Sequence, residues 1–187
     1  MQMTEFVTVV QRRKLTIDSE LFPVISPLFA IETQIGSYVG ASSCFLAAAA
    51  SFKQGTVHCV DTWDNRAMDS EPPRDTFAEF LHNVERFQRY IVPHRGEASA
   101  VASEIPSRLD ALFIDGDHSY EVVKSELSTY VPKIKAGGFL LLHDSQQEPM
   151  QRAMDEYLLT HHLISVGTTH SLCTLRVPHE SAEEIRT

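Results

Sequence analysis

Short apolar segments of strand length alternate with longer segments of helical character along most of the chain. The strand-length runs cover residues 28–35, 56–60, 90–92, 111–114 and 139–143. The segments between and after them, residues 41–52, 75–87, 98–105, 120–130 and 148–160, are long enough or periodic enough to form helices. This alternation predicts a parallel sheet covered by helices on both faces, the doubly wound α/β arrangement.

The end of the chain departs from that alternation. Two strand-like runs, residues 162–166 and 171–177, are separated by only four residues, which leaves no room for a helix. The pattern therefore predicts a terminal hairpin that places one antiparallel strand in the sheet.

The segment 120–130 shows the clearest helical periodicity. Its apolar positions include Val123, Leu127 and Tyr130, while Lys124 and Glu126 are expected on the opposite, polar side. The pattern predicts a helix that packs one side on the sheet and exposes the other.

Composition narrows the class of protein. The 187 residues are 43% hydrophobic and show no repeat or long linker, so we expect one domain over residues 1–187 with a core at about 20–177. The net charge of -9 disfavours binding to nucleic acid or anionic membranes. No apolar run is long enough to span a bilayer, and the first residues do not resemble a signal peptide. A cytoplasmic protein is expected, with its three cysteines as reduced thiols.

In an open α/β sheet, ligands bind beyond the carboxyl ends of the strands. The first strand is followed by Gly36 and Gly40, which allow a tight turn into a helix whose first N–H groups can bind an anion. Ser42 or Ser43 is a candidate cap of that helix. The G-x-G-x-x-G spacing of dinucleotide-binding proteins is absent here, which lowers the expectation of NAD binding.

The second and third strands end in acidic residues. Asp61 follows Gly36 by 25 residues, a position where doubly wound folds bind ribose hydroxyls, although an Asp that caps a turn would look the same. Trp63 is suited either to stacking on an adenine or to covering the edge of the core. Glu97 can accept a hydrogen bond from an adenine amino group or simply begin a helix.

The fourth and fifth strands end in the densest group of titratable residues. Asp115, Asp117 and His118 crowd a glycine turn after one strand, and His143 and Asp144 follow the other. If these strands are neighbours, Asp115 and Asp144 emerge side by side, a common arrangement for Mg²⁺. His118 and His143 are then the candidate general bases.

Four of these motifs together resemble the class I S-adenosylmethionine-dependent methyltransferases, and more specifically methyltransferase family 24. They lie at residues 35–42, 60–63, 113–120 and 137–144, and the resemblance extends over about residues 20–177. The family is related to macrocin-type and catechol-type O-methyltransferases. The resemblance implies a Rossmann-like sheet of seven strands with the last antiparallel, in agreement with the predicted hairpin.

The resemblance also implies roles for individual residues. The turn at Gly36 would approach the methionine part of the cofactor, Asp61 would hold the ribose, and Asp115 would lie near the sulfonium. The full set of implied cofactor-binding residues is Gln34, Gly36, Ser37, Tyr38, Ser42, Asp61, Thr62, Trp63, Gly96, Glu97, Ala98, Asp115 and His118. In metal-using relatives Asp115 and Asp144 would bind Mg²⁺ or another divalent cation.

One departure from the family pattern affects the expected chemistry. The family usually carries an acidic residue where this chain has Gln34, and a carboxamide supplies no charge for the amino group of the cofactor. The expected reaction is O-methylation of a small molecule or sugar, with Asp115, His118 and His143 as catalytic candidates; relatives commonly form homodimers. The alternatives are a catalytically idle protein that binds S-adenosylmethionine or a partner, and, less favoured, an NAD-dependent oxidoreductase.

Overall fold

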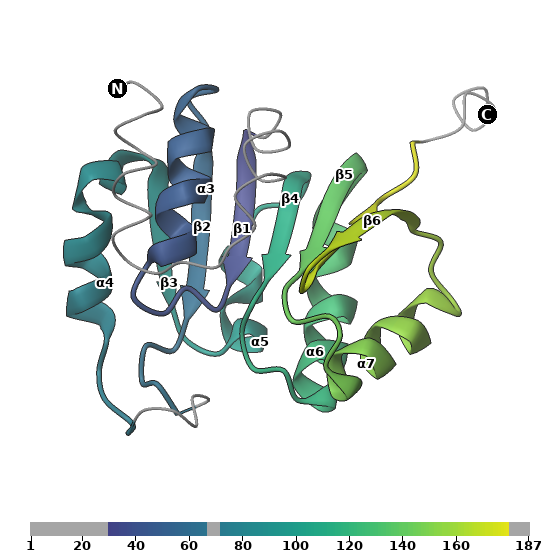
Figure 1. The fold of residues 1–187 in the computed structure, drawn as a ribbon. Coiled ribbons are helices and arrows are strands. Elements are labelled where there is room, and N and C mark those ends of the chain that lie inside the picture. The colour runs from purple at the N-terminus through teal and green to yellow at the C-terminus, as the bar shows by residue number, and fades with distance from the viewer. Residues whose placement is uncertain (1–29, 67–71, 180–187) are drawn as a thin grey trace.

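The computed structural model describes residues 30–66 and 72–179 (Figure 1). The start of the first predicted strand, residues 28–29, lies outside the described residues. The strands are β1 (Ile31–Ile35), β2 (Thr56–Asp61), β3 (Ile91–Arg95), β4 (Leu109–Ile114), β5 (Ile134–Leu142), β6 (Ile164–Thr169) and β7 (Leu172–Arg176). The α-helices are α3 (Ala41–Ser51), α4 (Phe77–Val84), α5 (Ala98–Val101), α6 (Tyr120–Tyr130) and α7 (Glu148–Leu158).

The seven strands form one sheet in the order β3-β2-β1-β4-β5-β7-β6. Strands β1 to β5 pair in parallel, whereas β7 pairs antiparallel with both β5 and β6. The predicted doubly wound sheet and its terminal hairpin are therefore confirmed. The strand order reverses between β1 and β4, so the turns that follow these two strands diverge and leave a crevice at that edge.

Two apolar cores lie on opposite faces of the sheet. One contains Leu46 of α3 and Phe80 of α4, and the other contains Val101 of α5, Leu127 of α6 and Met150 of α7. In Figure 1, α3 lies over the near side of β2, while α5 and α6 lie behind the sheet. Both faces are thus covered, which explains why β4 is buried at every one of its six positions.

The structure corrects the predicted polarity of α6. Val123, Leu127 and Tyr130 are fully buried as expected, but Glu126 is only 5% exposed and belongs to the same buried stripe. Its position three residues after Val123 and four before Tyr130 is the helical spacing of that stripe, so the assignment of Glu126 to the polar side was wrong.

Two predicted helices are shorter than expected and continue as 3-10 turns. The helix predicted at 75–87 consists of α4 followed by a 3-10 segment over Glu85–Tyr90, and α5 is followed by one over Ala102–Glu104. Within the described parts of the chain, no helix has the length and apolar character needed to cross a bilayer.

Candidate functional site

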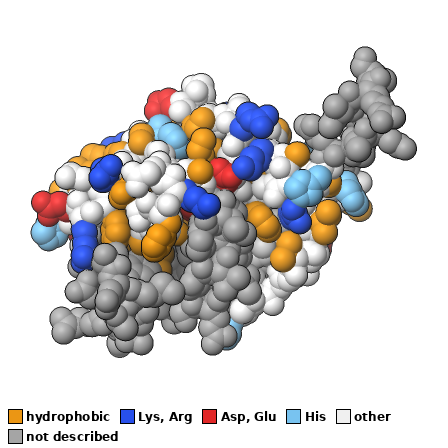
Figure 2. All heavy atoms as spheres, turned by 90° about the horizontal axis from the view of Figure 1, so that it is seen from above, with side chains coloured by type: hydrophobic (Ala, Val, Ile, Leu, Met, Phe, Trp, Pro, Cys, Tyr) orange, Lys and Arg blue, Asp and Glu red, His pale blue; other side chains and the backbone are white. Residues whose placement is uncertain are grey.

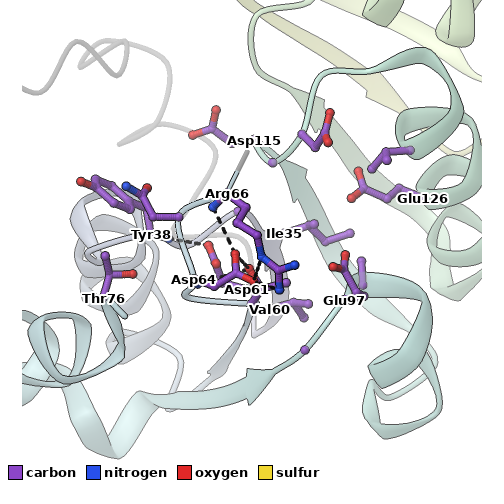
Figure 3. Close-up of a pocket in the computed structure, with 18 residues that line it drawn as sticks. Ile35, Tyr38, Val60, Asp61, Asp64, Arg66, Thr76, Glu97, Asp115 and Glu126 are labelled. Atoms are coloured by element: carbon purple, nitrogen blue, oxygen red, sulfur yellow. Dashed lines mark hydrogen bonds and ion pairs between the residues drawn. The ribbon is translucent and has the colours of Figure 1, made fainter. Parts of the chain in front are cut away.

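A cleft of about 330 Å³ opens at the carboxyl ends of the first four strands. Its walls come from the ends of β1 and β2, from the segments that follow β1, β2, β3 and β4, and from α6 (Figure 3). The lining residues are Ile35, Gly36, Tyr38, Val60, Asp61, Thr62, Asp64, Asn65, Arg66, Thr76, Gly96, Glu97, Ala98, Asp115, Gly116, Asp117, Val122 and Glu126. The predicted strand-end residues thus meet at one edge of the sheet.

The turn after β1 depends on glycine at its first position. Gly36 has a φ of +83°, and a Cβ added there would lie 2.2 Å from the carbonyl oxygen of Asp115. The turn is fixed further by backbone hydrogen bonds from Gly36 to Val60 and from Asp115 to Ile35. Glycine therefore lets the loops after β1 and β4 approach each other directly beneath the cleft.

The helix that follows this turn is not capped as predicted. Gly40 occupies the N-cap position, and neither Ser42 nor Ser43 caps the helix. Instead, Nε2 of Gln34 donates to Oγ of Ser42 at 2.5 Å, and Ser43 donates to Oε1 of Gln34 at 2.7 Å. These three side chains join β1 to α3 in the protein interior.

Several residues predicted to bind the cofactor do not line the cleft. Gln34 and Ser42 are engaged in that buried contact, and Ser37 is 2% exposed. Trp63 is fully buried, donates from its indole nitrogen to the carbonyl of Tyr38, and packs against Phe80. The structure therefore gives Trp63 the core-covering position rather than one that could stack on an adenine.

Asp61 lies at the centre of the β2 end of the cleft. Its two carboxylate oxygens accept hydrogen bonds from the backbone N–H groups of Tyr38 at 2.8 Å and Trp63 at 2.6 Å. Because a carboxylate has about four acceptor positions, these bonds leave capacity for ligand hydroxyls. Asp61 joins the turns after β1 and β2 and still faces the cleft; the neighbouring Thr62 also lines it.

The third strand contributes Gly96, Glu97 and Ala98, all of which line the cleft. The N–H of Gly96 donates to the carbonyl of Asp61, which holds this segment against β2. The hydroxyl of Tyr130 donates to the carbonyl of Ala98 at 2.6 Å, which fastens it to α6. The end of β3 is therefore a fixed wall that bridges β2 and α6.

The ends of β4, β5 and β7 bring together the predicted catalytic candidates. Ile114 pairs with Leu142 in the sheet, so the residues after them, Asp115 and His143, lie side by side. Nδ1 of His143 is 2.9 Å from Oδ1 of Asp115, and its Nε2 is 3.2 Å from Oγ of Ser171. Sequence analysis missed Ser171, because the hairpin register that brings it here is not visible locally.

The other two members of this cluster are more loosely placed. His118 lies 4.0 Å from Asp115 and 3.7 Å from Asp144, and His143 lies 3.6 Å from Asp144. The close Asp115 carboxylate raises the pKa of His143, an effect that outweighs partial desolvation, and Asp144 adds to it. Of the two neighbouring carboxylates, Asp115 therefore has the larger effect on the pKa of His143.

The predicted metal ligands, Asp115 and Asp144, each face a histidine. In the described part of the chain, no group of three or more His, Cys, Asp or Glu side chains is arranged to hold a metal ion. The need for a divalent cation at these two residues remains a prediction.

Glu126 is the cleft residue that sequence analysis missed most clearly. Burial, together with the nearby negative charges of Asp117 and Glu97, raises the pKa of its carboxyl to about 8. Its Oε2 atom has no hydrogen-bond partner. A buried carboxyl without a partner is uncommon enough in folded proteins to require an explanation.

The cleft is strongly acidic. Six carboxyl side chains line it, whereas Arg66 is the single Lys or Arg among its described lining residues and already pairs with Asp64. The opposite end of the molecule differs: Figure 2 shows Lys and Arg side chains scattered among polar and hydrophobic ones. The cleft therefore favours a ligand that carries positive charge.

Comparison with known proteins places the chain in a protein family. A family model described as a methyltransferase domain matches residues 33–145, more than half of the chain. The uncharacterized protein R132 of Acanthamoeba polyphaga mimivirus is 31% identical over 64 residues, which cover 34% of this chain and 28% of that protein. The chain thus spans less than a third of the length of this curated relative.

Solved structures share the fold at low sequence identity. Cofactor-bound Rv0187 from MTB has a TM-score of 0.65 and 13% identity, with 95% of this chain and 89% of that chain covered. The O-methyltransferase TomG from Streptomyces achromogenes, solved in complex with SAM, has a TM-score of 0.63 and 12% identity, with 91% and 86% covered. These similarities confirm the predicted Rossmann-like fold.

Proposed function

The chain belongs to the methyltransferase domain family, and from that membership we propose that it transfers a methyl group from S-adenosylmethionine to a hydroxyl group of a small molecule or sugar. The acidic cleft at the switch point of the sheet is the observation that carries this proposal. The structural similarity to TomG, an O-methyltransferase solved with SAM, supports the same cofactor and the same type of acceptor atom.

The charge of the cleft favours this cofactor over a dinucleotide. S-adenosylmethionine carries a sulfonium, an ammonium and a carboxylate group and so has a net positive charge, whereas NAD carries a pyrophosphate that the ionised carboxylates of the cleft would repel. No cation is free to offset that repulsion among the described lining residues, since Arg66 is paired with Asp64. The oxidoreductase alternative is therefore disfavoured.

The residues present fit the cofactor at three points. The turn at Gly36 lines the cleft without a side chain, Asp61 has acceptor capacity for the ribose hydroxyls, and Asp115 offers a carboxylate beside that turn. When bound, S-adenosylmethionine supplies an electrophilic methyl group. The protein would orient it against the acceptor, which is the main contribution an enzyme makes to such a transfer.

We favour His143 over His118 as the base that takes the hydroxyl proton. Asp115 lies 2.9 Å from its Nδ1, whereas no group lies closer than 3.7 Å to either nitrogen of His118 in the ion pairs it forms. A carboxylate at Nδ1 orients the ring and leaves Nε2 to accept a proton. The acceptor hydroxyl would take the position beside Nε2 that now faces Ser171.

A divalent cation at Asp115 and Asp144 is a separate proposal. Two carboxylates can bind Mg²⁺ together with water, and the cation would stabilise the developing alkoxide. Activity that is unchanged by EDTA would remove the cation from the mechanism. A homodimer is likewise proposed and is tested by light scattering in solution.

The reaction is tested by incubating the purified chain with methyl-labelled S-adenosylmethionine and a panel of hydroxylated small molecules and sugars. Transfer of label, read by mass spectrometry and dependent on His143, supports the proposal. If the protein binds S-adenosylhomocysteine but no panel member is methylated, the result favours a catalytically idle cofactor-binding protein. That alternative is suggested by Gln34, which stands where the family usually has an acidic residue.

A further inference from the structure

The unpartnered carboxyl of Glu126 lies close to Gly116, the residue that follows Asp115. Figure 3 shows Glu97 and Glu126 on one side of the cleft and Asp61 and Asp64 on the other. Glu126 is only 5% exposed, yet it lines the cleft, and its Oε2 lacks a hydrogen-bond partner. This polar atom is therefore withdrawn from water, in a side chain that borders the space where a ligand would bind.

The surroundings of Glu126 identify which part of a nucleoside cofactor it would meet. Tyr130, one helical turn further along α6, holds the carbonyl of Ala98, so Glu126 stands beside the segment 96–98 that follows β3. If Asp61 binds the ribose and Asp115 faces the reacting end, the base must lie on the remaining side, between that segment and α6.

We propose that the side chain of Glu126 hydrogen-bonds the nucleobase of the bound cofactor and is a determinant of its recognition. This inference rests on the proposed function. It adds a residue on α6 to those that the strand ends supply, and it gives the buried carboxyl the partner that it lacks in the protein alone.

The chemistry of a neutral carboxyl matches an adenine edge. Each hydrogen-bonding edge of adenine presents an amino donor beside a ring-nitrogen acceptor, which is why the carboxamides of Asn and Gln pair with it. A protonated carboxyl offers the same combination, one donor and one acceptor. Burial together with the charges of Asp117 from the β4–α6 turn and Glu97 before α5 holds Glu126 in that neutral form at neutral pH, and Tyr130 on α6 is uncharged there.

The experiment is a calorimetric cycle of variants and ligands. S-adenosylhomocysteine and its 1-deaza, 3-deaza and 7-deaza analogues, each lacking one ring nitrogen, are titrated into wild type, Glu126→Gln and Glu126→Leu. Glu121→Gln, an exposed change on the same helix, is the matched control. Circular dichroism and thermal unfolding establish that each variant is folded.

We expect wild type, Glu126→Gln and the control to lose about tenfold in affinity for either the 1-deaza or the 7-deaza analogue, and not for the 3-deaza analogue, whose missing nitrogen is not beside the amino group. Glu126→Leu should bind S-adenosylhomocysteine about tenfold more weakly and should no longer distinguish that analogue. A residue with only a structural role would change the unfolding temperature but would leave this discrimination intact.

Two results would overturn the inference, and they have different meanings. Equal discrimination among the analogues by wild type and Glu126→Leu would exclude the contact but leave the proposed function standing. If Glu126→Leu does not fold, wild type and Glu126→Gln are compared at pH 9.5. Wild type should then no longer distinguish the analogues, because its carboxyl has lost the proton that it donates, whereas Glu126→Gln should still distinguish them. Wild type that still distinguishes them at pH 9.5 would exclude the contact. Folded wild type that binds no S-adenosylhomocysteine at all would contradict the proposed function itself.

Discussion

The two halves of the site are built in different ways. Around Asp61 the loops are held by hydrogen bonds to the backbone. Both carboxylate oxygens of Asp61 accept bonds from backbone N–H groups, and the turn at Gly36 is bonded to Val60 of β2. Around His143 the side chains of β4, β5 and β7 approach one another, and several of the separations are 3.6 Å or more. Under the proposed function, the first half would be a preformed frame for the cofactor, and the second would engage the acceptor and its proton.

The largest effect should come from breaking the frame. Gly36→Ala introduces a Cβ at 2.2 Å from a backbone oxygen at a residue with φ +83°. We expect a loss of about 3 kcal/mol or more in the free energy of unfolding and no measurable binding of S-adenosylhomocysteine. Chemical denaturation and calorimetry provide the measurements.

Gly116→Ala is the matched control for that change. The nearest atoms to its added Cβ would belong to Ile35, Glu126 and Gly36, at 3.5 Å, 3.7 Å and 3.8 Å, and Gly116 does not have a positive φ. We expect a loss of less than about 1 kcal/mol. Equal stability and equal affinity in the two variants would show that the frame does not depend on the close approach at Gly36.

In the other half, His143→Ala should remove chemistry without removing the cofactor. We expect kcat to fall about 100-fold with the affinity for S-adenosylhomocysteine unchanged within about threefold. His118→Ala should lower kcat by about tenfold or less, since its ring is farther from Asp115. A larger loss in His118→Ala would reverse the assignment, and wild-type rates in both variants would exclude a histidine base.

A smaller effect concerns stability and pH at Glu126. Its folded-state pKa of about 8 lies above the usual value of 4.5, so the folded protein holds a proton that the unfolded chain releases between these values. Stability contributed by Glu126 is therefore present at low pH and is lost as pH rises toward 8. The Tm of Glu126→Gln minus the Tm of wild type should therefore be larger at pH 9 than at pH 5, by about 2 °C or more.

The control for this comparison is Glu121→Gln, because Glu121 is exposed on the same helix. Its Tm difference from wild type should stay constant over the same pH range. A constant difference for Glu126→Gln as well would mean that its carboxyl is ionised in the folded protein.

The smallest expected effect tests the acidity of the cleft. S-adenosylmethionine carries one positive charge more than S-adenosylhomocysteine, so its binding should weaken more as salt screens the carboxylates. We expect the affinity ratio of the two ligands to change by about twofold to fivefold between low and high ionic strength, measured by calorimetry. A ratio independent of salt would show that the carboxyl groups do not act on the sulfonium.

The backbone frame was the more predictable half of the site. Apolar runs, turns and the position of Asp61 after β2 are local properties of the sequence, and the parallel sheet brings the strand ends together without further information. Neighbouring strands were expected to place Asp144 beside Asp115, but the register of β4 and β5 places His143 there. Ser171 was not predicted, because the register of an antiparallel hairpin depends on distant pairing.

Residues with ambiguous polarity were the least predictable. Glu126 was assigned to solvent because it is charged, although its spacing from Val123 and Tyr130 matches the buried stripe. Trp63 and Gln34 were placed near the cofactor by their position in a motif, but packing against Phe80 and bonding to Ser43 draw them into the interior. Which way such side chains turn depends on neighbours that a single sequence does not identify.

The most direct test of the account is a calorimetric titration of the folded wild-type protein with S-adenosylhomocysteine and, separately, with NADH. The acidic cleft and the frame around Gly36 and Asp61 predict saturable one-to-one binding of S-adenosylhomocysteine and no binding of NADH. Binding of NADH, or no binding of S-adenosylhomocysteine by protein shown to be folded, would contradict the assignment of the cleft as the cofactor site.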